Sequence, residues 1–329
     1  MIKVAIITSG GDASGINAVF EGILTCEEIE LWGFHDGYDG ICENEPFRLT
    51  KKIVKEHIHT GNALLHTSRS KRTFNKEGRE EIVCKLKEND FDILVVCGGE
   101  GSGKGASLLS KEGMRTLLVP MTIDNNIYGT DYTVGYHTAC HYIADGVRRL
   151  RQTGMNLPGR IFMMETFGGQ SGQLALGGAI AGGADYVLLP EQPINMEKLL
   201  RRAKDCLEKQ GQFIVVNCES NTLNGEWIRG KQGASFEIGN EIEKAMGVRV
   251  RYSILGYTQR AGDSIEADVM DAIKIGLAVA EEIVKGTTNA MVGLVDGKAV
   301  LVPLEDVFSK TKDLIATNKY IALKLKMID

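Results

Sequence analysis

Four segments of the sequence combine glycine with side chains that bind phosphate or carry protons, and each follows a short apolar run. They are Thr8–Gly15 (TSGGDASG), Gly98–Gly105 (GGEGSGKG), Pro120–Asn126 (PMTIDNN) and Glu165–Gly172 (ETFGGQSG). Adjacent glycines after a strand let backbone N–H groups face an anion, and the N-terminus of a following helix adds positive potential. The first two segments therefore predict a polyphosphate site, with plain strand-to-helix turns as the alternative interpretation.

The second segment is the richest in such groups. It holds five glycines, the carboxylate of Glu100 and the ammonium group of Lys104 within eight residues. It is not a Walker A loop, because the GxxxxGK[ST] spacing is absent. A carboxylate beside phosphate-binding amides suits a polyphosphate that arrives with its metal ion.

Asp124 is the candidate for proton transfer, since it follows a predicted strand and has the hydroxyl of Thr122 and the amide of Asn125 beside it. A carboxylate in this position can accept the proton of a substrate hydroxyl that attacks a phosphoryl group. The alternative is that Asp124 caps the next turn. Arg160, Arg251 and Arg260 lie near later predicted strands, where guanidinium forks suit phosphate oxygens, although each taken singly is better explained as a surface charge.

The elements that would position these residues alternate between short apolar runs and longer amphipathic ones, which is the pattern of layered α/β proteins with parallel sheets. Two further runs, Met291–Val295 and Ala299–Val302, flank Asp296-Gly297 and predict a hairpin. The expected strands are Val4–Thr8, Ile29–Phe34, Ile93–Cys97, Leu117–Pro120, Ile161–Glu165, Tyr186–Leu189, Phe213–Asn217 and Val250–Leu255. The expected helices include Gly135–Arg151, Ser171–Gly182, Met196–Gln210, Phe236–Met246, Ala267–Val284 and Leu314–Met327.

Composition narrows the class of protein. The 329 residues carry a net charge of −5, which argues against a nucleic-acid-binding protein, and there is no apolar run long enough to span a membrane. Glycine is unusually frequent at 39 residues while proline is limited to 6, so the excess glycine belongs to turns and close backbone approaches rather than to linkers. Seven scattered cysteines without a CxxC pair are typical of reduced thiols, and we expect a cytoplasmic protein.

Taken together, the motifs resemble those of the 6-phosphofructokinase family of the bacterial ATP-dependent type, in family order and across nearly the whole chain. The resemblance rests on the segments SGGDA (9–13), GGEGS (98–102), TIDN (122–125), GTDYT (129–133) and LGYTQR (255–260). It implies an enzyme with two similar doubly wound (Rossmann-like) α/β domains and the active site in the cleft between them. We expect a larger nucleotide-binding domain at 1–133 plus about 252–304, and a smaller sugar-phosphate-binding domain at 134–251 plus about 305–329.

The resemblance implies a glycolytic kinase that transfers a phosphoryl group from ATP–Mg²⁺ to the 1-hydroxyl of fructose 6-phosphate. Asp124 is then the general base, Thr122 lies beside it, Tyr38 contacts the nucleoside and Arg69 bridges the transferring phosphate. The expected cradle for the donor is Gly10, Gly99, Glu100, Gly101, Ser102 and Gly105, with Glu100 as the magnesium ligand.

The same resemblance implies a sugar-phosphate site and a homotetramer or dimer, in which a neighbouring subunit supplies Arg160 and Arg251. Glu219 would accept a hydroxyl of the sugar. The remaining expected contacts are Thr122, Ile123, Asp124, Phe167, Gly168, Gly169, Tyr257 and Arg260.

Several positions depart from the family pattern. Glu100 and Asn126 stand where the family has aspartates, which leaves less carboxylate oxygen for a hard cation. Gly169 stands where an arginine would face the transferring phosphoryl group, and loss of such a donor costs about 10²–10³ in rate. Tyr257 replaces a histidine and can still donate a hydrogen bond.

Two further positions bear on the phosphoryl donor. Gly101 leaves the space of the α-phosphate free, which favours ATP, because an aspartate at this position accompanies pyrophosphate use in the family. Met121 matches neither the glycine of ATP enzymes nor the lysine of pyrophosphate enzymes. The alternatives are the same fold with pyrophosphate or another sugar phosphate, and a catalytically weak paralogue that binds or regulates.

Overall fold

The computed structural model describes residues 1–229 and 233–328, and the chain divides into two compact units. Unit 1 consists of Met1–Thr138 and Arg260–Lys312, and unit 2 of Ala139–Gln259 with the segment from Asp313 onward. The chain therefore passes between the units after residues 138, 259 and 312. The last residue of the expected second domain, Asp329, lies outside the described residues.

Unit 1 is built on a seven-stranded sheet in the order β13-β12-β5-β4-β1-β2-β3. The strands from β12 to β2 are parallel, and the edge strands β13 and β3 pair antiparallel. Strands β4 and β5 are buried along their whole length, as expected for central strands that helices cover on both faces. The strands are β1 (Ile2–Ser9), β2 (Ile29–Gly33), β3 (Phe47–Arg48), β4 (Ile93–Gly98), β5 (Thr116–Pro120), β12 (Ala290–Val295) and β13 (Lys298–Pro303).

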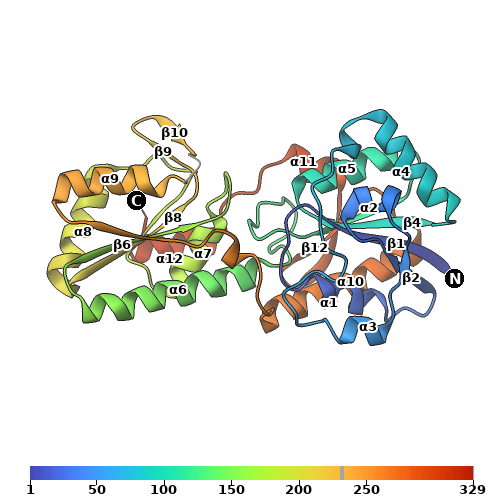
Figure 1. Cartoon of the computed structure of the whole chain (residues 1–329), viewed down its shortest axis with the longest axis horizontal. Helices are drawn as coiled ribbons and strands as arrows, with labels where there is room; N and C mark the ends of the chain where they lie inside the picture. Colours follow the sequence, from blue (N-terminus) through green and yellow to red (C-terminus); the bar gives the residue numbers. More distant parts are fainter. Residues whose placement is uncertain (230–232, 329) are drawn as a thin grey trace. The chain divides into compact units, whose positions relative to one another are not determined.

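Helices cover both faces of this sheet, with α2, α4, α5 and α11 on one face and α1, α3 and α10 on the other (Figure 1). Helices α1 and α10 approach so closely at Gly22 that a Cβ there would lie 2.5 Å from the Ile273 carbonyl oxygen. The helices are α1 (Ile16–Ile23), α2 (Gly37–Glu43), α3 (Lys51–Lys55), α4 (Lys76–Glu88), α5 (Glu100–Lys111), α10 (Glu266–Lys285) and α11 (Leu304–Ser309), with a 3₁₀ turn η1 (Arg72–Phe74).

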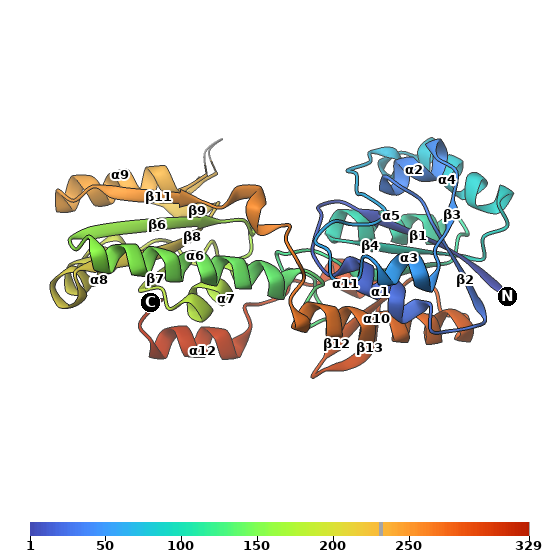
Figure 2. The same ribbon diagram turned by 60° about the horizontal axis from the view of Figure 1, so that its bottom comes forward.

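Unit 2 contains a four-stranded parallel sheet in the order β11-β6-β8-β7 and a separate two-stranded hairpin, β10-β9. Helices α9 and α12 lie on opposite sides of the four-stranded sheet (Figure 2). The strands are β6 (Arg160–Thr166), β7 (Tyr186–Leu188), β8 (Gln212–Cys218), β9 (Asn221–Leu223), β10 (Glu226–Ile228) and β11 (Val250–Ile254). The helices are α6 (Tyr136–Asn156), α7 (Gln173–Gly182), α8 (Met196–Gln210), α9 (Ser235–Met246) and α12 (Ala316–Lys324), with a 3₁₀ turn η2 (Gly256–Gln259).

The sequence-based expectation of an α/β fold with two Rossmann-like domains is confirmed. Each of the eight expected strands forms within one or two residues of its predicted bounds, and the expected helix at Met196–Gln210 has the predicted ends. The hairpin between β12 and β13 also forms. Its turn residues Asp296 and Gly297 have φ angles of 50° and 70°, the left-handed conformation that two-residue hairpin turns require.

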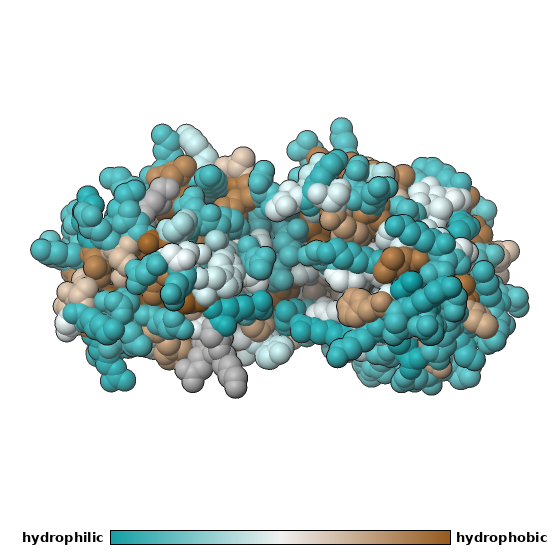
Figure 3. All heavy atoms as spheres, turned by 90° about the horizontal axis from the view of Figure 1, so that it is seen from above, coloured by the Kyte–Doolittle hydropathy of each residue, from teal (hydrophilic) through white to brown (hydrophobic). Residues whose placement is uncertain are grey.

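Hydrophilic side chains predominate on the face of the molecule seen in Figure 3, and apolar residues are scattered among them. Within the described residues, the structure contains no helix that combines the length and the apolar character of a membrane span.

Candidate active site

The strand order of unit 1 brings three of the predicted loops together. In the sheet, β2 lies on one side of β1, whereas β4 and β5, which come later in the chain, lie on the other side. The direction of winding therefore reverses between β1 and β4. The last residues of these strands pair directly, Ser9 with Gly98 and Gly98 with Pro120. Because ligands of doubly wound sheets bind where the winding reverses, at the carboxyl ends of the strands, this edge is the expected binding site.

The first two loops are joined by direct contacts. Ser102, in the first turn of α5, donates a hydrogen bond from Oγ to Ser9 Oγ at 2.9 Å. A Cβ at Gly98 would lie 2.6 Å from Ser102 Cβ and 2.7 Å from the Ser9 carbonyl oxygen. Gly10 has a φ angle of 100°, which L side chains rarely adopt. Glycine at Gly98 and Gly10 is therefore required by close packing and by backbone conformation.

Tyr38 supports the same loop from α2. Its side chain is buried, and its hydroxyl donates a hydrogen bond to the Ser102 carbonyl oxygen at 2.6 Å. Burial raises the pKa of this phenol well above its usual range, so the hydroxyl stays protonated and donates. Tyr38 also lines the cavity, while its hydroxyl holds the first turn of α5 in place.

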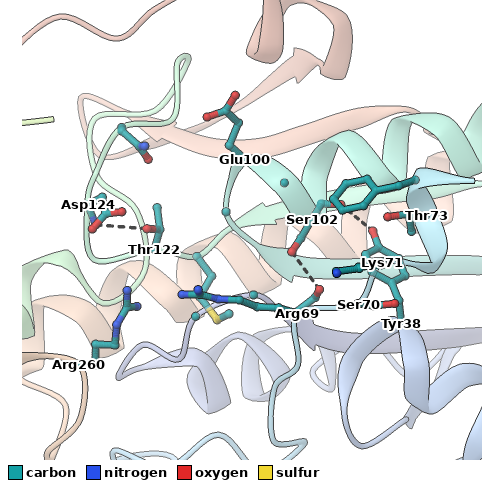
Figure 4. A pocket seen from close by; sticks show the side chains of 18 residues that line it. Tyr38, Arg69, Ser70, Lys71, Thr73, Glu100, Ser102, Thr122, Asp124 and Arg260 are labelled. Atoms are coloured by element: carbon teal, nitrogen blue, oxygen red, sulfur yellow. Dashed lines mark hydrogen bonds between the residues drawn. The ribbon is translucent and has the colours of Figure 1, made fainter. Parts of the chain in front are cut away.

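A cavity of about 460 Å³ opens beside these loops, entirely within unit 1 (Figure 4). In the view of Figure 4, Asp124, Thr122 and Arg260 lie at one end and Tyr38, Ser70 and Thr73 at the other. The lining residues are Ser9, Gly10, Gly11, Tyr38, Arg69, Ser70, Lys71, Thr73, Phe74, Gly99, Glu100, Gly101, Ser102, Met121, Thr122, Asp124, Asn126 and Arg260.

Asp124 and Thr122 reach the cavity from the loop after β5. The backbone N–H of Asp124 donates to Thr122 Oγ1 at 3.2 Å, and the Thr133 hydroxyl donates to the Thr122 carbonyl oxygen. These contacts fold the loop back on itself. The carboxylate of Asp124 is half-buried, as suits a base that must meet a substrate hydroxyl.

Two arginines add positive charge to the cavity. Arg69 is exposed along its wall, and Arg260 packs against the first glycine loop. The guanidinium of Arg260 donates to the Asp12 carbonyl oxygen at 3.4 Å, and a Cβ at Gly11 would lie 2.4 Å from Arg260 Nη1. Gly11 is therefore the residue that lets Arg260 approach the loop.

Carboxylate is sparse in this site. Glu100 is exposed at the start of α5, and the ammonium group of Lys104 contacts its Oε1 at 2.5 Å. Among residues 1–229 and 233–328 there is no group of three or more acidic, histidine or cysteine side chains that would hold a metal by itself. Mg²⁺ commonly needs only one or two carboxylates when substrate phosphates supply the other oxygens, so Glu100 fits this mode of binding.

Two of the predicted contacts that belong to unit 1, Gly105 and Ile123, are not part of the cavity lining. Gly105 lies on the inner side of α5, where a Cβ would meet Thr73 at 3.0–3.1 Å. Ile123 is completely buried between Thr122 and Asp124. Neither residue lines the cavity of unit 1, so their ligand contacts stay predictions.

Unit 2 gathers the predicted sugar contacts at the carboxyl ends of its parallel strands. The backbone N–H of Gly169 donates to Glu219 Oε1 at 3.1 Å, which joins the loops after β6 and β8. The rings of Phe167 and Tyr257 pack edge to face with centroids 5.5 Å apart. Gly168 has a φ angle of 140° and a Cβ there would lie 2.4 Å from the Ser171 carbonyl oxygen, so this loop requires glycine at that position.

Arg160 and Arg251 lie at the opposite, amino-terminal edge of the same sheet. Arg160 begins β6, and Arg251 is the second residue of the neighbouring strand β11. Strand pairing places Val250 opposite Ile161, so Arg251 and Arg160 lie at the same edge, and Arg251 Nη1 donates to the Arg249 carbonyl oxygen at 2.8 Å. Desolvation and the charges of Arg160 and Arg249 lower the pKa of Arg251. Because β6 spans about 20 Å at ~3.3 Å per residue, one ligand cannot bridge this arginine cluster and Glu219 of the same chain.

Sequence reasoning missed several residues at these positions. Ser70, Lys71, Thr73 and Phe74 line the cavity, and only their place directly after Arg69 in the sequence indicates this. In unit 2, Arg229 Nη2 lies 3.7 Å from Glu219 Oε1, and Arg249 joins the cluster of Arg160 and Arg251. A lone arginine on a loop carries no recognisable pattern, so these contacts depended on the fold.

A doubly wound sheet whose switch point carries glycine loops, two arginines and two carboxylates in one cavity has the features of a phosphate-binding α/β protein. Comparison with known protein families identifies the family within this class of protein: residues 3–283 match the family described as phosphofructokinase. The chain belongs to the phosphofructokinase family, as the resemblance of its motifs indicated.

Its relatives include the ATP-dependent 6-phosphofructokinase 1 of Clostridium perfringens, which is 35% identical over 306 residues and 91% of each chain. The ATP-dependent 6-phosphofructokinase of Natranaerobius thermophilus is 34% identical over 316 residues, covering 95% of this chain and 96% of the relative. Among solved structures, the pyrophosphate-dependent phosphofructokinase of Marinobacter aquaeolei superimposes with a TM-score of 0.85, covering 99% of this chain and 91% of the other. At 21% identity this likeness establishes the fold alone.

Proposed function

We propose that this protein is an ATP-dependent 6-phosphofructokinase of glycolysis, which transfers the γ-phosphoryl group of ATP to the 1-hydroxyl of fructose 6-phosphate. The products are fructose 1,6-bisphosphate and ADP. The observation that carries the proposal is that Asp124 shares one cavity with the glycine loops at the switch point of unit 1. The names of the relatives at 34–35% identity support the same reaction.

In the proposed mechanism, Asp124 accepts the proton of the sugar 1-hydroxyl while the hydroxyl oxygen attacks the γ-phosphorus, and the bond to the β-phosphate oxygen breaks. Thr122 hydrogen-bonds the reacting groups beside the base. Arg69 bridges the transferring phosphate, and Arg260 supplies a second guanidinium to anionic ligands in the same cavity. The protein thus contributes mainly positioning and charge, which is what phosphoryl transfer requires.

The donor is proposed to lie across Gly10, Gly99, Gly101 and Ser102, with its nucleoside toward Tyr38. Gly101 supports ATP in particular, because a Cβ built there has no neighbour within 4 Å and the helix terminus is open. Glu100 is the residue that would hold Mg²⁺, which neutralises charge on the phosphates when it is bound. Unit 1 is accordingly the nucleotide-binding domain.

Unit 2 is proposed to bind the sugar phosphate, with Glu219 accepting a sugar hydroxyl and Phe167, Gly168, Gly169 and Tyr257 around it. We assign Arg160 and Arg251 to the 6-phosphate bound by a neighbouring subunit, because they lie at the opposite edge of the sheet from Glu219. The protein is therefore proposed to work as a homotetramer or dimer, in the cytoplasm where the other reactions of glycolysis take place.

The test is a side-by-side measurement of fructose 6-phosphate turnover with ATP and with pyrophosphate. We expect ADP release with ATP–Mg²⁺ and little turnover with pyrophosphate. Turnover with pyrophosphate alone would favour the second candidate, for which the buried Met121 at the position of a donor-specific residue is the supporting observation. Sugar-phosphate binding without turnover of either donor would identify a non-catalytic paralogue.

A further inference from the structure

The loop that carries Asp124 runs from the end of β5 to the start of α6 and forms neither helix nor strand apart from an isolated bridge between Met121 and Val134. Such a segment must be held by side chains if it is to position a base. Its internal support is Asn125, which directly follows Asp124, is completely buried and has a φ angle of 49°. Asn125 Nδ2 donates to the Asp131 carbonyl oxygen at 3.1 Å. Its Oδ1 accepts from the backbone N–H of Thr133 at 3.0 Å.

A second support comes from outside the loop. Lys312 lies beyond the end of α11, and its Nζ donates to Asn125 Oδ1 and to the Asp131 carbonyl oxygen, both at 2.8 Å. These are the same two acceptors that close the loop from within. A single side chain therefore holds both ends of the turn. Lys312 lies 187 residues after Asn125 and 181 residues after Asp131 in the sequence. Charge-assisted hydrogen bonds of this length are among the stronger ones in proteins.

We propose that Lys312 is a positioning residue for catalysis, which anchors Asn125 and the Asp131 carbonyl group and thereby fixes the direction of the Asp124 carboxylate. The inference rests on the proposed function, since it presumes that Asp124 is the base. Lys312 itself does not line the cavity that holds Asp124.

The environment of Lys312 argues that its role is not stability. Desolvation lowers the pKa of its ammonium group to about 7, against the opposing effect of the Asp131 carboxylate. A depressed lysine pKa means that the fold disfavours the charged form. Moreover, each acceptor has a second hydrogen-bond donor besides Lys312. The backbone N–H of Thr133 donates to Asn125 Oδ1, and the side-chain amide of Asn125 donates to the Asp131 carbonyl oxygen. An apolar side chain of similar length would therefore leave no buried acceptor without a donor.

The experiment compares Lys312→Met with the wild-type chain, and uses Lys298→Met as the matched control because Lys298 is exposed on β13. Steady-state kinetics give kcat and the KM of each substrate, a thermal scan gives Tm, and hydrogen exchange reports on the backbone amide of Thr133. Lys312→Arg is the conservative variant, since it keeps the charge and the donors.

We expect Lys312→Met to keep or raise Tm and to leave the KM for ATP within about twofold, while kcat falls by about 10²-fold, the loss that misplacement of a reacting group by ~1 Å produces. The Thr133 amide should exchange about tenfold faster or more, because opening of the turn no longer breaks the hydrogen bonds from Lys312. Lys312→Arg should recover part of kcat, and Lys298→Met should match the wild type in every measurement.

Two results would overturn the inference: a kcat for Lys312→Met within twofold of the wild type, or a Lys312→Met chain that no longer folds while Lys312→Arg has full activity. The second result would assign Lys312 to stability. If the wild-type chain does not phosphorylate fructose 6-phosphate, the proposed function fails, but exchange of the Thr133 amide still tests the anchor. An unchanged exchange rate in Lys312→Met would then overturn it.

Discussion

The hydroxyl of Tyr38 donates a 2.6 Å hydrogen bond to the carbonyl oxygen of Ser102, and so couples α2 to the first turn of α5. Ser102 in turn hydrogen-bonds Ser9, at the end of β1. Through Ser102, one buried side chain thus supports the contact between two glycine loops whose residues Ser9 and Ser102 are 93 positions apart in the sequence. The tyrosine is expected to affect donor binding through this geometry.

Tyr38→Phe removes the hydroxyl and keeps the ring in the cavity wall. We expect a stability loss of about 1 kcal/mol, because a buried hydrogen bond is lost. We also expect a several-fold higher KM for ATP, with the KM for the sugar phosphate unchanged. Steady-state kinetics and thermal unfolding check both effects, and Tyr320→Phe is the control because Tyr320 is exposed on α12. A higher KM for the sugar alone would contradict this role.

Asp124→Asn keeps the shape of the side chain and removes its ability to accept a proton at neutral pH. We expect kcat to fall by about 10²–10⁴-fold, the usual contribution of a general base. The KM values should stay within a few-fold and circular dichroism should match the wild type. A coupled assay of ADP release measures kcat. Wild-type turnover by this variant would exclude Asp124 as the base.

Gly101→Asp tests the choice of phosphoryl donor. The added side chain has space, since no atom lies within 4 Å of a Cβ at this position, and an acid in the first turn of α5 does not destabilise the helix. Its charge would oppose the phosphates of ATP, so we expect kcat/KM for ATP to fall at least about tenfold, which is ~1.4 kcal/mol. Gly101→Ala is the matched control without charge. If both variants lower kcat/KM for ATP equally, the added volume at residue 101, rather than the charge, is the cause.

Gly169→Arg restores the guanidinium that the family pattern has at this position. The site is open, but Gly169 has a φ angle of 61°, so an L side chain costs about 1–2 kcal/mol of stability. We expect kcat to rise by about tenfold, since a donor facing the transferring phosphoryl group contributes up to ~10²–10³. Gly169→Ala separates the backbone cost from the effect of the charge. If Gly169→Arg and Gly169→Ala have the same kcat, the missing arginine is not what limits the rate.

The buried Lys312 predicts how stability depends on pH. Its pKa falls from 10.5 to about 7 on folding, so between these pH values the unfolded chain binds a proton that the folded chain has released. Stability contributed by this group therefore rises with pH across the window of about 7 to 10.5, and is constant below it. Denaturant unfolding of wild type and Lys312→Met at pH 6 and pH 9 checks this. The free energy of unfolding of the wild type should rise relative to that of Lys312→Met at the higher pH. A difference between the two chains that does not change with pH would contradict the pKa shift.

The sequence by itself determined the class of fold, most of the element positions and the location of the glycine loops. Continuous apolar runs such as Val4–Thr8 are typical of strands that are covered on both faces, and paired glycines directly after them favour close backbone approach. Asp124 could be singled out in the same way, because a carboxylate at a strand end among glycine loops is a local pattern.

Only the tertiary structure decided which of these residues meet. The strand order places Ser9, Gly98 and Pro120 side by side, although no local pattern encodes that order. The tie of Lys312 to Asn125, and the separation of Arg160 from Glu219 by the length of a strand, likewise depend on contacts between distant segments. Local sequence sets backbone conformation and burial, whereas convergence on one cavity follows from how the whole sheet is wound.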